Sequence, residues 1–283
     1  MHELGESSMA SLRRDAPSGD RPSVSEVALT HHGPPALPSR VTIIGISPGR
    51  IRGFNASIQN WILHIQTTTK LREFVSGLTH CIGGVLAIIG LVLLVVTASN
   101  PFRPWHLVTF AVYGTSMILL YTISMLFHWL PLSEKGVLRL RRLDHIMIFI
   151  FIAATYTPFC LIPFRGALGW SIFACIWAMA ALGGVFKLYW IHVPKWLCLA
   201  LYFFAGCFAF IATGPIIRTL QPWAIFWLIA GGIFYSIGAL FYALEKPEPT
   251  PKLIGYHDIF HIFVILGSIA HFWVIYRYVN VFN

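Results

Sequence analysis

The sequence predicts an all-α membrane protein in which seven transmembrane helices form a bundle. The first observation behind this prediction is composition: 57% of the 283 residues are hydrophobic, only 11% are charged, and the mean hydropathy is +0.71. An average soluble domain is roughly 45–50% apolar and about 25% charged. A soluble fold of this length would need more polar and charged side chains to cover its surface. The surplus apolar side chains must therefore face lipid. A soluble globular enzyme, a collagen-like fibre and a disordered chain are excluded.

The second observation is a series of seven apolar runs, each near the ~20 residues that a helix needs to cross a bilayer. The runs lie at about 74–97, 105–130, 144–163, 167–189, 193–213, 221–244 and 254–279. Proline and glycine mark the gaps between them, and tryptophans lie near their ends, as in an aromatic belt. The strands of a membrane β-barrel would alternate over about ten residues, and these runs do not.

The N-terminal quarter of the chain is different. Residues 1–54 are rich in Ser, Pro, Gly and Arg and are expected to be a disordered extension. Between 55 and 72, apolar residues recur at helical spacing on one face: Ile58, Trp61, Ile62 and Ile65. This spacing predicts an amphipathic helix on the membrane surface. Residues 73–283 form the predicted transmembrane domain.

Lysine and arginine are distributed unequally between alternate gaps. One set of gaps carries eight: Lys135, Arg139, Arg141, Arg142, Lys187, Lys195, Lys246 and Lys252. The other set carries three: Arg103, Arg165 and Arg218. Because positive loops stay in the cytoplasm, the count predicts a multi-pass protein of the plasma (inner) membrane, with a cytoplasmic N-terminus and an external C-terminus. The net charge of +9 is interpreted as contact with membrane lipids that have anionic head groups, and no nucleic-acid partner is expected.

Ionisable residues inside spanning segments are costly and often mark functional sites. Ser124 and His128 fall near the end of the second run, Asp144 and His145 at the start of the third, and the His257–His261 segment at the start of the seventh. With the predicted orientation, all three places lie in the cytoplasmic leaflet. Polar residues from three helices are therefore expected to meet at one depth.

The spacing of the histidines favours a metal. His257 and His261 are four residues apart, so both rings project from one helical face. Together with His128 they make three imidazoles, a set that suits zinc. Three protein ligands leave a fourth position open for water, as in catalytic zinc sites.

Simpler interpretations stay open for several polar residues. A membrane histidine often only bonds a neighbouring helix, and this interpretation is preferred for three: His80, His145 and His271. His271 lies ten residues beyond His261, about 15 Å along a helix, which is too far to join the same site. Asp258 is typical of a solvated carboxylate at the membrane interface, and Ser124 of a hydroxyl that bonds its own helix.

The string from His257 to His261 reads HDxxH, one methylene short of the HExxH motif of zinc proteases. An intramembrane protease would use this pair with Asp144 as the third ligand. Aspartate is shorter than the glutamate that serves such proteases as base, and this interpretation leaves His128 without a role. A further alternative for Asp144 is a helix-start carboxylate stabilised by the N-terminal dipole.

From about Arg72 to the C-terminus, the chain resembles the hemolysin III branch of the progestin and adipoQ receptor superfamily, which is related to alkaline ceramidases. The motifs that carry the resemblance are Ser124-x-x-x-His128, Leu143-Asp144, His257-x-x-x-His261 followed by His271-Phe272, and Glu73-Phe74 with Thr79-His80. The resemblance implies that three residues bind zinc: His128, His257 and His261. It also implies that Asp144 and Ser124 lie beside the water that zinc activates. The long N-terminal segment departs from the compact bacterial members.

Three functions remain open at this point. The first is a zinc-dependent hydrolase of a lipid amide or ester at the cytoplasmic leaflet, in which Asp144 takes a proton from water and Ser124 holds the carboxylate or the water. The resemblance to ceramidases favours an amide. The second is a signalling or membrane-homeostasis protein with structural zinc. The third is the cytolysis that the branch name indicates, although pore formers usually carry long amphipathic or secreted segments.

Overall fold

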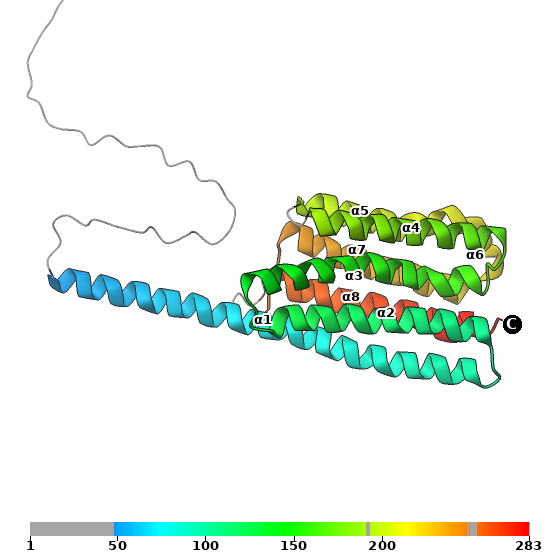
Figure 1. The fold of residues 1–283 in the computed structure, drawn as a ribbon, viewed down its shortest axis with the longest axis horizontal. Coiled ribbons are helices and arrows are strands. Elements are labelled where there is room, and N and C mark those ends of the chain that lie inside the picture. The colour runs from blue at the N-terminus through cyan, green and yellow to red at the C-terminus, as the bar shows by residue number, and fades with distance from the viewer. Residues whose placement is uncertain (1–47, 191–192, 248, 250–253, 283) are drawn as a thin grey trace, which may run out of the picture. The chain divides into compact units, whose positions relative to one another are not determined.

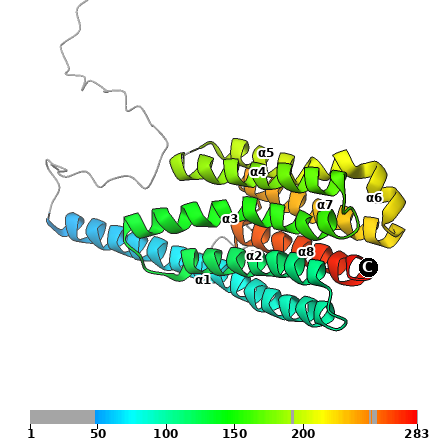
Figure 2. The same cartoon turned by 45° about the vertical axis from the view of Figure 1, so that its right-hand side comes forward.

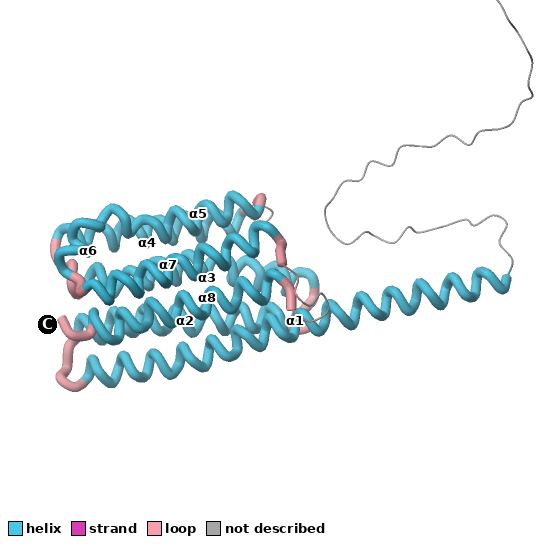
Figure 3. Tube along the Cα trace, turned by 180° about the vertical axis from the view of Figure 1, so that it is seen from behind, coloured by secondary structure: helices cyan, strands magenta, loops and turns pink. Residues whose placement is uncertain are grey.

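The computed structural model describes residues 48–190, 193–247, 249 and 254–282, with side chains from Glu73 onward. Within these ranges the chain forms helices joined by short loops and no strand (Figure 3). The elements are α1 (Pro48–Ser99), α2 (Pro104–Trp129), α3 (Glu134–Leu161), α4 (Ala167–Tyr189), α5 (Lys195–Cys207), the 3₁₀ turn η1 (Phe208–Ala212), α6 (Thr213–Thr219), α7 (Pro222–Leu244), α8 (Tyr256–Val274) and the π turn η2 (Ile275–Val279).

Seven segments of the described chain are long and apolar enough to cross a membrane. They are Glu73–Ser99, Pro104–Trp129, Glu134–Leu161, Ala167–Tyr189, Lys195–Thr219, Pro222–Leu244 and Tyr256–Val279. The predicted seven-helix bundle is therefore confirmed. In two views, α1 and α2 lie on the opposite side of the bundle from α4 and α5, with α3, α7 and α8 between them (Figures 1 and 2).

The helix that contains the first span is longer than the span itself. Residues 1–47 of the predicted extension lie outside the described residues. The backbone from Pro48 onward is one continuous helix up to Ser99, so α1 includes residues 48–54, for which composition indicated disorder, and residues 55–72. A membrane-surface position for 55–72 stays a prediction.

The third span begins ten residues earlier than the sequence indicated, at Glu134 and not at 144. Basic residues lower the hydropathy of this stretch, but Lys and Arg are good helix formers, and Ser133 caps the helix by accepting a hydrogen bond from the Gly136 N–H at 3.4 Å. Asp144 therefore lies ten residues into α3. Because the helix dipole acts within the first turn, the interpretation of Asp144 as a helix-start carboxylate is wrong.

The fifth span is interrupted, whereas the sequence indicated one run over 193–213. It is α5, then η1, then α6. Pro215 has no N–H for the carbonyl one turn earlier and crowds it, which accounts for the change just before this residue. The hydroxyl of Tyr156, from α3, donates to the Gly206 carbonyl at 2.6 Å and accepts from the Ala209 N–H at 2.8 Å. Irregular backbone at membrane depth needs such partners.

The helix α3 is the central helix of the bundle. Of its most apolar window, 56% is buried, against 17% for the fifth and sixth spans. The main core contains Tyr113 and Tyr121 of α2, Leu94 of α1 and Val274 of α8. Three helices that surround the polar residues discussed below, α1, α2 and α8, thus share one core.

Orientation in the membrane gives the first testable prediction. Of the eight basic residues counted on one side, Lys187 is buried in the last turn of α4, which leaves seven against three and the same direction. We expect reporters fused after Arg72 and after Asn283 to report opposite sides, with the first in the cytoplasm. Two reporters on the same side would contradict an odd number of spans.

Lys187 has an unusual partner for a buried amine. Its side chain is 1% exposed, and its ammonium nitrogen lies 2.7 Å from the sulfur of Cys198, in α5. A buried charge or amine without a partner is costly. This contact therefore joins α4 to α5 on the side of the bundle away from α1.

The pair gives a second prediction. Cys198→Ala is expected to lower the free energy of unfolding by about 1–3 kcal/mol, because a buried polar group loses its partner. Adding Lys187→Met should restore much of the loss, because a buried polar pair can be replaced by apolar side chains at little cost. Chemical unfolding in detergent of both single variants and the double variant measures the coupling. Purely additive losses would show that the two side chains do not interact.

Candidate metal centre

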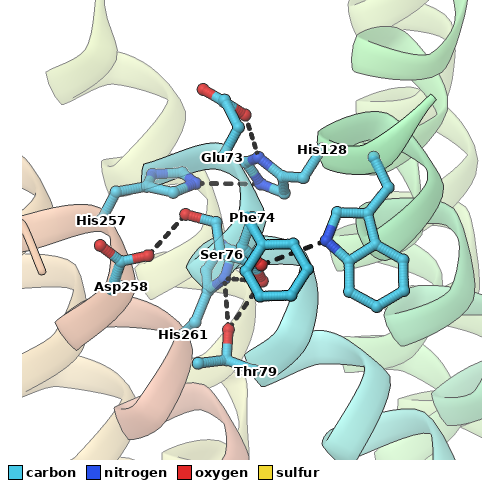
Figure 4. Close-up of polar contacts among 9 residues, drawn as sticks. Glu73, Phe74, Ser76, Thr79, His128, His257, Asp258 and His261 are labelled. Atoms are coloured by element: carbon cyan, nitrogen blue, oxygen red, sulfur yellow. Dashed lines mark hydrogen bonds and ion pairs between the residues drawn. The ribbon is translucent and has the colours of Figure 1, made fainter. Parts of the chain in front are cut away.

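Three histidines from two helices come close together (Figure 4). His128 lies in the last turn of α2, and His257 and His261 lie in the first two turns of α8. One potential ligand atom from each residue lies within 4.8 Å of the others. Among the described residues, these three form the one group of three or more His, Cys, Asp or Glu side chains that could hold a metal ion. The sequence indicated the same three histidines.

The spacing of these nitrogens fits zinc. His128 Nε2 and His257 Nε2 are 3.3 Å apart. Two nitrogens bound to one tetrahedral zinc at 2.0–2.1 Å would be separated by about 3.3 Å. His261 is 2% exposed and the side chain of His128 is 4% exposed, so water has little access to compete for these rings. The three imidazoles therefore lie close enough together to bind a metal ion, and the printed separation of one pair matches that in a tetrahedral zinc site.

A third helix, α1, contacts two of the three rings. The carboxylate of Glu73 lies 2.6 Å from His128 Nδ1. His261 Nδ1 lies 3.1 Å from the Thr79 hydroxyl and 3.2 Å from the Ser76 carbonyl (Figure 4). In both histidines these bonds engage Nδ1, which leaves Nε2 as the nitrogen available to a metal.

Asp258 is buried, although the sequence indicated a solvated carboxylate. It is 2% exposed; Oδ1 accepts from the Ser76 hydroxyl at 2.6 Å, and Oδ2 accepts from the Gly255 N–H at 2.8 Å. The second bond satisfies an orphan donor at the start of α8, as a capping residue does. Position in the first turn of a helix indicates exposure only when no neighbouring helix covers that turn, and here α1 does. Because both oxygens are engaged, Asp258 is poorly placed to act as the base of a protease.

Ser124 and Asp144 interact with each other, and Asp144 lies near His128. The hydroxyl of Ser124, which is 2% exposed, interacts with the Asp144 carboxylate, and His128 lies within electrostatic reach of that carboxylate. Asp144 does not belong to the group whose atoms lie within 4.8 Å of one another, which in the described residues consists of the imidazoles. This arrangement disfavours the protease interpretation, in which Asp144 would be a direct ligand.

The remaining histidines behave differently from one another. His271 bonds the Leu228 carbonyl of α7 at 3.2 Å, the interhelical role expected for it. His145 Nδ1 bonds the Arg141 carbonyl of its own helix at 2.7 Å, and an interhelical bond of its other ring nitrogen stays a prediction. His80 stacks on His261 with ring centroids 3.7 Å apart, and neither of its ring nitrogens has a hydrogen-bond partner in the described structure. The interhelical hydrogen bond expected for His80 is therefore wrong.

The polar contacts of α1 were not assigned to this site from the sequence. Glu73, Ser76 and His80 are spaced at i, i+3 and i+7, which places them on one face of a helix. Polar residues at that spacing at the start of an apolar span were the available signal. The spacing could not show that this face packs against α2 and α8, because that depends on the tertiary arrangement.

Comparisons with known proteins agree with the resemblance noted in the sequence. A family model described as "Haemolysin-III related" matches residues 68–272. Hemolysin-3 of Bacillus cereus is 38% identical over 218 residues, which are 75% of this chain and 95% of that protein. The Hemolysin-3 homolog of Bacillus subtilis is 36% identical over 211 residues, 74% and 95% of the two chains. The monocyte to macrophage differentiation factor of Homo sapiens is 26% identical over 183 residues, 62% and 71% of the two chains.

The family match covers more than half of the chain and includes all of the site, from Glu73 in α1 to His261 in α8. The two Bacillus relatives are matched over nearly their whole length. The seven apolar segments are those of a protein that crosses the membrane repeatedly. The chain is therefore a multi-pass integral membrane protein that belongs to the haemolysin-III-related family.

Proposed function

We propose that His128, His257 and His261 bind one zinc ion and that the protein is a zinc-dependent hydrolase of a lipid amide or ester. The observation that carries this proposal is the separation of 3.3 Å between two imidazole nitrogens, with a third imidazole in the same group. Protein-bound zinc held by three imidazoles keeps a fourth position for water or substrate. A site with only a structural role usually has four protein ligands.

When bound, zinc would act as a Lewis acid that makes water a nucleophile at neutral pH. The residues of the chain then have separate tasks. The Asp144 carboxylate would take a proton from the attacking water and deliver it to the leaving amine or alcohol. The Ser124 hydroxyl, which interacts with that carboxylate, would hold it in place. General bases of this kind typically contribute about 10²–10⁴-fold in rate.

The substrate class follows from the position of the site within the spans. The three histidines lie in the end turns of two membrane-spanning helices. With the predicted orientation, these turns lie in the cytoplasmic leaflet of the plasma membrane. A lipid whose amide or ester bond lies near the head group could reach this depth sideways from the bilayer. The resemblance to alkaline ceramidases favours an amide.

A structural role for zinc is the second candidate, and one observation favours it. The three histidines lie on α2 and α8 and their partners on α1, so a metal at this place would join α2 to α8, with α1 packed against the rings. The protein would then serve membrane homeostasis or signalling without catalysis. Cytolysis is indicated only by the names of the Bacillus relatives.

One experiment separates these functions. The purified full-length protein is reconstituted with a panel of lipid amides and esters, and released fatty acid is measured together with zinc content and dye leakage from the vesicles. We expect fatty-acid release that a chelator abolishes and that added zinc restores. Bound zinc without release on any lipid would favour the structural role, and leakage without release would favour cytolysis.

A further inference from the structure

We propose that Glu73 and Thr79 of α1, a helix that supplies none of the three imidazoles, are positioning residues that set the zinc affinity of the site. This inference rests on the proposed zinc site. It assigns to α1 the task of fixing which ring nitrogen of His128 and of His261 carries the proton.

Glu73 fixes the position of the proton on His128. An ionised carboxylate can only accept hydrogen bonds, so the contact of 2.6 Å with Glu73 requires the proton of the neutral ring to be on Nδ1. The lone pair of His128 is then on Nε2, the atom that lies 3.3 Å from His257 Nε2. The side chain of His128 is 4% exposed while that of Glu73 is 57% exposed, so the carboxylate reaches a buried ring from the solvent side.

Thr79 and the Ser76 carbonyl fix the position of the proton on His261. The Thr79 hydroxyl has one proton, and it donates this proton to the Ser76 carbonyl at 2.7 Å. Toward His261 Nδ1, at 3.1 Å, the Thr79 oxygen must therefore accept. The Ser76 carbonyl, at 3.2 Å from the same nitrogen, is also an acceptor. Both contacts place the proton on Nδ1 and leave the lone pair on Nε2, as in His128.

Ser76 bonds Asp258, the chain neighbour of His257. The Ser76 hydroxyl donates to Asp258 Oδ1 at 2.6 Å, while the other carboxylate oxygen accepts from the N–H of Gly255. Ser76 thus connects α1 to the first turn of α8, which carries His257. Three residues of α1, at positions i, i+3 and i+6, thus contact two of the three rings and the first turn of α8.

The close approach of α1 to α2 makes these contacts geometrically feasible. At Gly77, an added Cβ would lie 2.0 Å from the indole of Trp129, so a larger residue would push the two helices apart. The Trp129 indole N–H donates to the Phe74 carbonyl at 3.1 Å, and the two aromatic rings stack. These contacts lie beside Glu73 in the chain and hold it at the level of His128 (Figure 4).

Partners of this kind orient metal-binding histidines and raise their basicity, and losing one typically weakens metal binding by about 10–100-fold. We expect a loss of this size in Glu73→Ala. Glu73→Gln should lose less, because its amide oxygen still accepts from Nδ1. Thr79→Val keeps the shape but removes one of the two acceptors of His261 Nδ1 and leaves only the Ser76 carbonyl, so zinc binding should weaken. Thr79→Ser keeps the hydroxyl and should bind zinc like the unchanged protein.

The test is zinc titration of the full-length, metal-stripped protein in competition with a chromophoric chelator, with the visible spectrum of the cobalt-loaded protein as a second readout. Glu245→Gln is the matched control, because Glu245 is a similarly exposed carboxylate that is paired with Lys195. Thermal unfolding in excess chelator shows whether each variant folds without metal. If Glu73→Ala fails to fold, the Thr79→Val and Thr79→Ser pair decides.

Unchanged zinc affinity and an unchanged cobalt spectrum in both Glu73→Ala and Thr79→Val would overturn this inference, provided that the unchanged protein binds zinc and His128→Ala does not. A different result would remove the proposed zinc site itself: no zinc binding by the unchanged protein, or equal binding by His128→Ala. The two failures are therefore distinguishable.

Discussion

Replacing His128, His257 or His261 by Ala is expected to remove most of the zinc, which should be about one ion per chain in the unchanged protein. The three ligand atoms lie within 4.8 Å of one another, and two imidazoles alone leave half of a tetrahedral shell to water. Elemental analysis of the purified variants measures the loss directly. It is the largest effect on metal content that the structure predicts.

Two other buried histidines are the matched controls for this experiment. His80→Ala and His271→Ala should retain zinc, because neither residue belongs to the group of three. His271 bonds the Leu228 carbonyl instead and lies about 15 Å along α8 from His261 by helix rise. His80 stacks on His261 and contacts the ring of Tyr121, and neither of its ring nitrogens is hydrogen-bonded in the described structure. If the His271 variant lost its zinc with the three proposed ligands intact, the depth argument that excludes His271 would be wrong.

The sequence was sufficient for the number of spans but not for where two of them begin or break. Hydropathy detects residues that prefer lipid, so it located all seven segments. It missed the first ten residues of α3, where basic side chains extend the helix beyond its apolar part. It also missed the interruption after α5, because the effect of Pro215 on the preceding turn is a matter of backbone hydrogen bonds and not of hydropathy.

At the site, too, the sequence predicts which residues share a helical face but not which helices pack against that face. Spacing of four residues places His257 and His261 on one face, and this holds in any helix. The meeting with His128 was indicated by depth in the membrane. The roles of Glu73 and Asp258 depend on how α1 packs against α2 and α8, and no spacing along one helix contains that information. Asp258 is buried for this reason, although its place in the chain is typical of a solvated cap.

The fold also narrows what Asp144 can do. Asp144 lies ten residues into α3, too far from the N-terminus for the helix dipole to stabilise its charge. It also does not belong to the group formed by His128, His257 and His261. It still interacts with the Ser124 hydroxyl and lies close enough to His128 for their charges to interact. This placement is compatible with the role of general base that we propose for Asp144.

Asp144→Asn should therefore keep zinc and lose turnover. Asparagine preserves the shape and a hydrogen-bonding group, and three imidazoles remain for the metal, while hydrolysis of a lipid amide or ester should fall by about 10²–10⁴-fold through loss of the general base. Glu134→Gln, an exposed carboxylate at the start of the same helix, is the matched control and should change neither quantity. Zinc content and released fatty acid are measured on the same preparations. A sharp drop in zinc would make Asp144 a direct ligand, as the protease interpretation requires, whereas retained zinc with unchanged turnover would exclude Asp144 as the base and with it the proposed mechanism.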